Sequence, residues 1–590
     1  MNIKQFLLRL FASVGLIMTI SIGVGAYATW NFFHPKITQP ELPKEMILTL
    51  DFTAPVVEQV QDFRLSLPAL LEEGGETPLL HIIRALENAK DDPKVKGVIA
   101  KFGSEPIDLV HVQEIAMALD HFRASGKFTY AFATSYGDFG PGSGLYSLAS
   151  HFENIWLQPI GAVAYSAASI EAPFGKSALE KFGVQTDFMR REDYKSVMEN
   201  VTRDSFSAPV RANMESMLSS LNGQIARIVA MGRRIDIGKS TSLMAGGPYT
   251  ANEALAAGLV TKLGYVDEIT KEVEEKAGKD AEPVDPAYYL YVYNQNRKDE
   301  AKGTIAVIYG EGMITDTPAE GPYRLAEDGM IDTASIVGAF DDASKDKDVK
   351  AILFRVNSPG GSPVASETIR RALIKAKESK KPIYVSMGSV AASGGYWIAM
   401  NADYIVANPA TITGSIGVVA GKFVLGEMFD KLGVKFDTIS SDGRAGMWSP
   451  RTPFDTKGRE RMNAMLDETY KAFTDNVSAA RKIAPEKMPD VAKGRVFTGE
   501  QAFKVGLIDE IGGMDSTILA LKKELKLKPT DRVYLQQFPP PETPETLVIR
   551  MLHNLRFGGA VVMDFMREFQ KVSAALRPVI GMINDNGVIT

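Results

Sequence analysis

The chain contains no cysteine among its 590 residues. This excludes a cysteine nucleophile, a cysteine-ligated zinc site and structural disulfides. The absence suits an exported protein that avoids thiols, without establishing one. Histidine is also scarce: there are six, and none lies between Phe152 and Leu552. A catalytic serine in that interval would need a histidine from a distant segment, so lysine is an alternative base from the outset.

Excess positive charge is absent as well. The 66 Lys and Arg residues are outnumbered by 72 Asp and Glu residues, which gives a net charge of −6. This balance gives no support to nucleic-acid binding, and no nucleic-acid partner is expected. A chain of this length exceeds a single hydrophobic core, so two or more domains are expected.

Charge is missing altogether from the apolar run at residues 10–33, which Lys4 and Arg9 precede. The run is long enough to span a bilayer as a helix. Positive charge before it predicts a cytoplasmic N-terminus, residues 1–9, with the bulk of the chain on the other side of the membrane. Ala26-Tyr27-Ala28 resembles a signal-peptidase site, so a cleaved signal peptide is the competing interpretation. Under both interpretations the bulk of the protein is exported.

An internal repeat organises the remaining sequence. Similar segments recur in the same order, 95–102 at 349–356, 155–159 at 405–409, and 250–259 at 498–507. Each copy alternates short apolar strands with amphipathic helices, which predicts an α/β fold with a largely parallel sheet. In the second copy the expected elements are strands at 305–309, 351–356 and 383–387, and helices at 333–343 and 366–377. The sequence therefore predicts two α/β domains at 45–275 and 303–525, a polar linker at 276–302, and a helical tail at 539–590.

The stretch 382–417 carries the features of a nucleophile site. An apolar strand is followed by an expected small-residue turn at 388–392, then Ser393-Gly394-Gly395, then an expected helix at 396–401. A serine at a strand-to-helix turn exposes its hydroxyl, and the helix N-terminus offers N–H groups to an oxyanion. An ordinary tight turn is the alternative for an isolated SGG.

The two copies differ where this chemistry would lie. The second copy has Pro359-Gly360-Gly361 after a strand, and the first copy lacks that glycine pair. Glycine pairs permit positive φ and leave backbone N–H groups free, so Gly361 and Gly394 are the candidate oxyanion donors. A complete nucleophile site is therefore expected only in the second copy.

Three segments, N-S-P-G-G at 357–361, A-A-S-G-G-Y at 391–396 and T-G-S-I-G at 413–417, resemble the signal peptide peptidase A (protease IV) family. The long form of that family, with tandem domains, is the close match, and Tyr194-Lys195-Ser196 in the first copy extends it. The resemblance implies Ser393 as nucleophile, Lys195 as general base and acid, and Ser415 as the residue that orients the lysine. No lysine occurs in 442–450, where the short form carries its own. Lys422 is the competing base within the second copy.

The resemblance also implies a ClpP/crotonase-like fold for each copy, no metal or other cofactor, and a homotetramer shaped as a bowl open to the membrane. The implied protein is a single-pass protein of the inner (cytoplasmic) membrane with most of its chain in the periplasm. It would hydrolyse cleaved signal peptides and other apolar peptides. Met313, Met387, Met447 and Trp448 are candidates for the pocket lining, although core packing is their ordinary role.

Two other functions remain open at this point. A crotonase-like enzyme acting on acyl-thioesters would share the fold and an oxyanion hole, but an exported protein has little access to coenzyme A. A non-catalytic scaffold that binds peptides would leave the serine and lysine without a chemical task. Reaction with a serine-directed acylating probe separates the peptidase from both alternatives.

Overall fold

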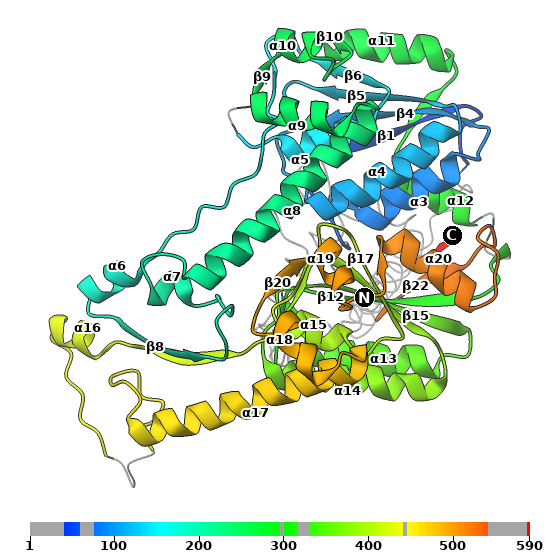
Figure 1. The fold of residues 1–590 in the computed structure, drawn as a ribbon. Helices are drawn as coiled ribbons and strands as arrows, with labels where there is room; N and C mark the ends of the chain where they lie inside the picture. Colours follow the sequence, from blue (N-terminus) through cyan, green and yellow to red (C-terminus); the bar gives the residue numbers. More distant parts are fainter. Residues whose placement is uncertain are drawn as a thin grey trace, which may run out of the picture.

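The computed structural model describes residues 41–59, 76–138, 140–295, 297, 300–316, 330–439, 445–540 and 587–589. The chain forms two α/β units, each built on its own sheet, with a pair of long arms reaching away from them (Figure 1). The expected anchor at 10–33 and most of the expected helical tail lie outside the described residues. Among the helices that are described, none has the length and apolar character needed to cross a membrane.

The first unit contains a six-stranded sheet in which every neighbouring pair is parallel. Its order is β10 (Lys262–Leu263), β6 (Asn154–Leu157), β5 (Phe128–Ala133), β4 (Val95–Phe102), β1 (Met46–Phe52), β11 (Glu282–Val284). Its helices are α3 (Leu79–Ala89), α4 (Leu109–Ala124), α5 (Ser143–Ala149), α8 (Ala208–Arg233), α9 (Ile237–Gly246), α10 (Ala251–Ala256), α11 (Val266–Ala277) and α12 (Pro286–Gln295). Shorter elements are β2 (Val56–Val57), β3 (Thr77–Pro78), β7 (Ala162–Val163), α6 (Lys176–Lys181), β8 (Gln185–Arg190), α7 (Glu199–Thr202) and β9 (Tyr249–Thr250).

The second unit contains a nine-stranded, mostly parallel sheet. Its main path is β20 (Val496–Thr498), β18 (Ile412–Gly414), β16 (Ile383–Ala392), β15 (Val349–Ser358), β12 (Thr304–Glu311), β22 (Tyr534–Phe538), β23 (Gly587–Ile589), and β17 (Tyr404–Ala407) joins β16 to β21 (Glu510–Ile511). Its α-helices are α13 (Thr333–Lys345), α14 (Pro363–Ala376), α15 (Gly394–Ala399), α16 (Gly426–Lys431), α17 (Thr456–Arg481), α18 (Met488–Val491), α19 (Gly499–Lys504) and α20 (Met514–Glu524). Shorter elements are β13 (Met313–Thr315), β14 (Met330–Asp332), β19 (Val419–Val424) and the 3-10 turns Lys377–Ser379 and Pro485–Lys487.

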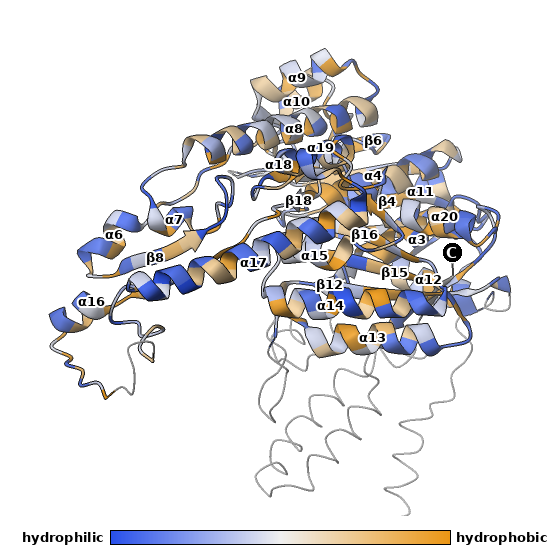
Figure 2. Ribbon diagram, turned by 60° about the horizontal axis from the view of Figure 1, so that its bottom comes forward, coloured by the Kyte–Doolittle hydropathy of each residue, from blue (hydrophilic) through white to orange (hydrophobic). Residues whose placement is uncertain are grey.

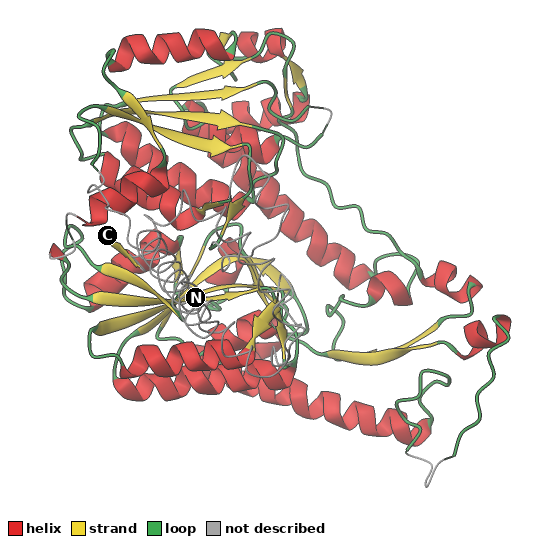
Figure 3. Cartoon of the chain, turned by 180° about the vertical axis from the view of Figure 1, so that it is seen from behind, coloured by secondary structure: helices red, strands yellow, loops and turns green. Residues whose placement is uncertain are grey.

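Helices cover both faces of each sheet (Figure 3). Apolar side chains of β5 point alternately to the two faces, and each face is covered. On one face Phe128, Tyr130 and Phe132 pack against α11. Ala131 and Ala133 of the same strand pack in the larger core on the opposite face. A strand that is apolar on both sides in this way is typical of a parallel sheet covered by helices.

The units are joined through their arms. β8 of the first unit pairs antiparallel with β19 of the second, from Gln185 opposite Val424 to Arg190 opposite Val419. The long helices α8 and α17 run beside this ribbon. Figure 2 shows polar and apolar residues interleaved along α17, whose buried residues Met462, Leu466, Phe473 and Val477 recur at helical spacing.

The expected strands and helices of the second unit are confirmed, but the predictions for the segments 388–392 and 276–302 are corrected. The segment 388–392 is not a turn: β16 continues to Ala392, because its first half pairs with β17 and its last three residues pair with β18. The segment 276–302 is more than a linker, since it contains β11, which pairs with β1, and α12. The Tyr289 and Leu290 side chains of α12 are buried in the first core, which the polar composition of the segment concealed.

Candidate active site

Ser393 lies at the point where β16 passes into α15. Its backbone has φ 55° and ψ −118°, a conformation that residues other than glycine rarely adopt. The turn is held because Ser393 N donates to Gly414 O at 2.9 Å and Trp397 N donates to Ser393 O at 3.0 Å. Strain of this kind, fixed by its surroundings, is common where a nucleophile is presented at a strand-to-helix turn.

Lys195 comes from the first unit, in the segment that follows β8. Its side chain is buried against the second unit, with 3% of the residue exposed. Tyr194 N donates to Lys493 O at 3.0 Å, and the Lys195 backbone crosses Gly494 so closely that a Cβ on that glycine would lie 2.5 Å from Lys195 N. Gly417 likewise leaves room for the aliphatic stem of Lys195. Glycine at these positions lets the two units approach closely enough for the lysine to enter the site.

The Lys195 ammonium meets both candidate serines. Its Nζ donates to Ser393 Oγ at 2.9 Å, to Ser415 Oγ at 3.0 Å and to Ser415 O at 3.0 Å. Ser393 and Lys195 are 198 positions apart in the chain. The structure therefore brings together the three residues named from the sequence as nucleophile, base and orienting group.

Burial lowers the pKa of Lys195 to about 8. No carboxylate accompanies this ammonium in the part of the chain that the structure describes. The charged form thus loses hydration without gaining an ion pair, which favours the neutral amine. A lysine that titrates near neutral pH can accept a proton from a serine hydroxyl in hydrogen-bonding contact.

The two oxyanion candidates also lie beside the serine. Gly360 has φ 110°, and a Cβ on it would come within 2.7 Å of Gly394 N and 2.9 Å of Ser393 Cβ. The turn that ends in Gly361 is therefore packed directly against the N-terminus of α15. Neither Gly361 N nor Gly394 N donates a backbone hydrogen bond to another described residue. Both N–H groups are thus free to bind an oxyanion.

The lysine segment is supported by three residues that the sequence did not predict, Arg190, Glu199 and Ser207. Arg190 Nη1 donates to Lys195 O at 3.0 Å and to Glu199 Oε1 at 2.7 Å. Ser207 Oγ donates to the same carboxylate at 2.6 Å, and these bonds lower the pKa of Glu199 although its burial acts in the opposite direction. Glu199 is a single charge whose partners lie nine and eight positions away, so no local sequence pattern marked it.

Lys422, the competing base, is occupied elsewhere. Its Nζ donates to Met447 O at 2.7 Å and Ser449 O at 2.8 Å, and it lies 4.3 Å from the centre of the Phe454 ring. Two of the residues predicted to line the pocket differ in exposure: Met387 is fully buried in the core, whereas Trp448 is 60% exposed. Lys422 fixes the loop that carries Trp448 instead of approaching the nucleophile.

A serine held at a strained strand-to-helix turn, a buried lysine in contact with its hydroxyl, and two free N–H groups form the arrangement of a serine hydrolase that uses a lysine base. The family model for peptidase family S49 matches residues 121–280 and 375–528. Protease 4 of Salmonella typhi is 34% identical over 477 residues, which cover 79% of this chain and 75% of that protein. Protease 4 of Haemophilus influenzae is 32% identical over 74% of this chain and 71% of its own length. A chloroplastic serine protease, SPPA, of Arabidopsis thaliana is 28% identical over 85% of this chain and 72% of its own.

The chain belongs to peptidase family S49. It is a serine protease, and a serine–lysine dyad is the mechanism of its family. Both matched regions fall within the two α/β units, which is consistent with a tandem duplication.

Proposed function

We propose that the protein is a membrane-anchored endopeptidase that hydrolyses cleaved signal peptides and other apolar peptides with Ser393 as nucleophile and Lys195 as base. Each repeat would have a ClpP/crotonase-like fold. The observation that carries the assignment is the 2.9 Å contact between Lys195 Nζ and Ser393 Oγ, made across the two units. It also gives the first unit a reason to be retained although its own site lacks the glycine pair.

In the proposed reaction, neutral Lys195 takes the hydroxyl proton as Ser393 Oγ attacks the scissile carbonyl carbon. The carbonyl π electrons move to oxygen, and the Gly361 and Gly394 N–H groups bind the oxyanion. The carbon–nitrogen bond then breaks, and the Lys195 ammonium protonates the leaving amine. Water, deprotonated by the same lysine, hydrolyses the acyl-serine, while Ser415 keeps Nζ directed at the reacting atoms.

Apolar side chains near the glycine turn support an apolar substrate. Met313 is 53% exposed and directly precedes Ile314, whose carbonyl oxygen faces Gly361. Val364, three residues after Gly361, is 65% exposed. Such exposed apolar groups beside a reaction centre suit the side chains of a signal peptide.

An anchor at residues 10–33 in the inner membrane, with the catalytic units in the periplasm, is part of this proposal. It rests on the uncharged run and the preceding Lys4 and Arg9. A membrane location would bring the site to signal peptides, which remain in the bilayer after cleavage of their precursor.

Assembly into a homotetramer is also proposed, and the internal repeat supplies support for it. The motif K-x-G-V-x-x-D at 181–187 recurs at 431–437. In the first motif, Asp187 pairs with Arg459, the fourth residue of α17, at 2.9 Å. In the second, Asp437 is exposed, and so is Arg211, the fourth residue of the equally long α8. Pairing of Asp437 with Arg211 of a second copy would repeat the internal joint between chains.

Charge reversal tests this assembly. Arg211→Asp and Asp437→Arg should each dissociate the oligomer in light scattering, and the double variant should restore it. Asp342→Arg, at an exposed site on α13, is the control for an added positive charge. Single variants that keep the oligomer of the wild type would contradict the proposed contact.

A serine-directed fluorophosphonate tests the chemistry. We expect wild type to be labelled at Ser393, identified by peptide mass spectrometry, and Ser393→Ala to remain unlabelled while folded. An unlabelled but folded wild type would favour the peptide-binding scaffold or the crotonase-like alternative.

A further inference from the structure

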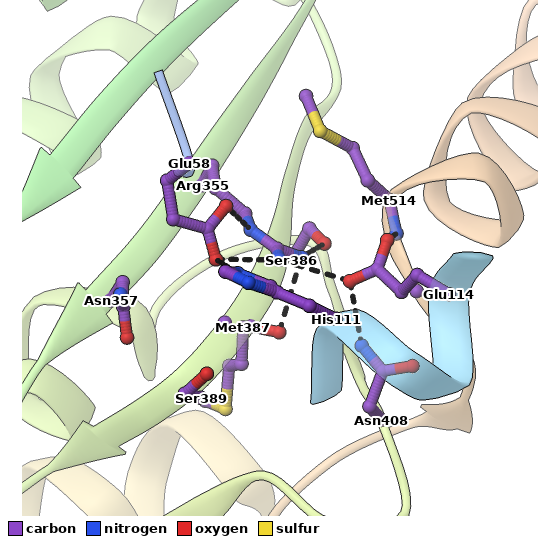
Figure 4. A network of polar contacts seen from close by, with 12 residues as sticks. Glu58, His111, Glu114, Arg355, Asn357, Ser386, Met387, Ser389, Asn408 and Met514 are labelled. Carbon is purple, nitrogen blue, oxygen red and sulfur yellow. Dashed lines mark hydrogen bonds and ion pairs between the residues drawn. The ribbon is translucent and has the colours of Figure 1, made fainter. Parts of the chain in front are cut away.

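A buried polar network joins the two units (Figure 4). At its centre Arg355 of β15 is 1% exposed. Its Nε and Nη2 donate to the two carboxylate oxygens of Glu58, each at 2.8 Å. Its Nη2 also lies 2.9 Å from Glu114 Oε1, and Nη1 donates to Ser386 Oγ at 2.9 Å. The guanidinium of the second unit is thus surrounded by carboxylates of the first.

The partners of this arginine extend the network through the joint. Glu114 Oε1 accepts from Asn408 Nδ2 at 2.8 Å, and Glu114 Oε2 accepts from Met514 N at 2.7 Å. His111 Nε2 lies 3.2 Å from Glu58 Oε1. Although burial alone would raise it, the Arg355 guanidinium and His111 lower the pKa of Glu58 to about 2. Glu58 is therefore a fixed negative charge at any physiological pH.

The network contacts β16 at an irregularity in that strand. Val356 of β15 lies opposite Met387 and Ser358 lies opposite Ala391, so β16 uses four steps where β15 uses two. The two additional residues form a bulge at Gly388 and Ser389. Bulges next to active sites redirect a strand and the side chains at its end. Here the bulge determines how the last residues of β16 deliver Ser393 to α15.

First-unit side chains hold this bulge. A Cβ on Gly388 would lie 2.7 Å from Glu58 Oε1, so the carboxylate rests against the strand. Ser389 Oγ donates to Asp108 Oδ2 at 2.9 Å, just before α4. On the side of the second unit, Val390 N donates to Asn357 Oδ1 at 3.1 Å. Both bulge residues therefore face a carboxylate of the first unit, and the residue that follows them is held by the second unit.

We propose that Glu58 and Asp108 are positioning residues of the peptidase, which act through Arg355 and the β16 bulge to fix Ser393 relative to Lys195 and the Gly361 turn. The inference rests on the proposed function of Ser393. The first unit then has two roles: it supplies the base, and it positions the strand that ends in the nucleophile. A buried ion pair is weak evidence of stabilisation, because apolar replacements are often as stable. Because the Glu58–Arg355 ion pair lies against the bulge, we assign it the role of fixing the geometry of β16.

Glu58→Gln keeps the size of the side chain but removes its charge and replaces one of the two oxygens that accept from Arg355 by an NH2 donor. We expect the rate of Ser393 acylation by the fluorophosphonate to fall between about 10- and 100-fold, the range in which small misplacements of reacting groups lie. The kcat for a chromogenic apolar peptide should fall with it while KM stays within about twofold of wild type. The pH midpoint should not move, since Lys195 keeps its surroundings. Glu500→Gln, which breaks the inter-unit pair with Arg227 away from β16, is the matched control and should keep the wild-type rate.

Asp108 provides a second variant that does not disturb the buried charges. Asp108→Ala should lower the acylation rate, and Asp108→Asn should restore it, because an amide oxygen can still accept from Ser389. If Glu58→Gln does not fold, this pair decides the matter. Folded variants at Glu58 or Asp108 with the wild-type acylation rate would overturn the inference. A wild type that is not labelled at Ser393 would instead overturn the proposed function.

Discussion

Protonation of Lys195 should control both the activity and the stability of the protein. Burial lowers its pKa from 10.5 to about 8, which corresponds to about 3 kcal/mol of unfavourable burial for the charged form. Only roughly a tenth of the lysine is neutral at pH 7, against a few parts in ten thousand for a solvated lysine. The kcat/KM for an apolar peptide should therefore rise about tenfold between pH 7 and a plateau above pH 9, with a midpoint near 8.

The same shift fixes the sign of the stability change. The folded state releases the Lys195 proton at a lower pH than the unfolded state, so the unfolded chain binds more protons between pH 8 and 10.5. The contribution of Lys195 to the free energy of unfolding therefore becomes more favourable as pH rises through that window. Lys195→Met should consequently be more stable than wild type at pH 7, by up to about 3 kcal/mol, and this advantage should shrink by pH 10.

Urea denaturation of both proteins at pH 7 and pH 10 measures that difference, and steady-state assays from pH 6 to 10 measure the midpoint. A kcat/KM that is flat across pH 7–9, or a Lys195→Met variant whose relative stability does not depend on pH, would refute the account of the buried amine.

Further predictions concern the groups around the dyad. Ser415→Ala removes one of the acceptors at 3.0 Å from Nζ and should lower kcat by roughly 10- to 100-fold with KM little changed, as measured by peptide hydrolysis. Gly494→Ala would bring a Cβ within 2.5 Å of Lys195 N and strain a φ of +79°, so acylation of Ser393 should fall sharply; an active variant would show that the lysine segment tolerates displacement. Gly361→Ala would place a Cβ 2.0 Å from Ile314 O, so the turn must shift and carry the Gly361 N–H away from the oxyanion; kcat should fall by up to about two to three orders of magnitude, and an unchanged kcat would show that the turn need not hold this position.

The strands and helices of the second unit were predictable because their apolar periodicity is local. The bulge in β16 was not, since it depends on β16 changing partner from β17 to β18. A Gly-Ser sequence reads as a turn unless the neighbouring strands are known. The helix α12 was hidden in a segment that is polar on average, although two of its tyrosines, Tyr289 and Tyr293, pack in the first core.

The candidate site was predictable in part. The motif around Ser393 and the divergence of the repeats pointed to the second unit, and the family resemblance supplied Lys195. Their contact could not follow from spacing, because it depends on the pairing of β8 with β19 across the two units. The Arg355 network is more distant still, since its ion pair with Glu58 joins residues 297 positions apart. Single charges in a sequence carry no sign of such partners.

The role of Lys195 as the base is measured by comparing Lys195→Ala with Lys422→Ala in peptide hydrolysis, with Ser393→Ala as the inactive reference and folding verified for each by circular dichroism. We expect Lys195→Ala to be as inactive as Ser393→Ala, because the only amine in contact with the nucleophile among the described residues is lost. Lys422→Ala should keep substantial activity. A folded, active Lys195→Ala protein together with an inactive Lys422→Ala protein would exclude Lys195 as the base and locate the dyad within the second unit.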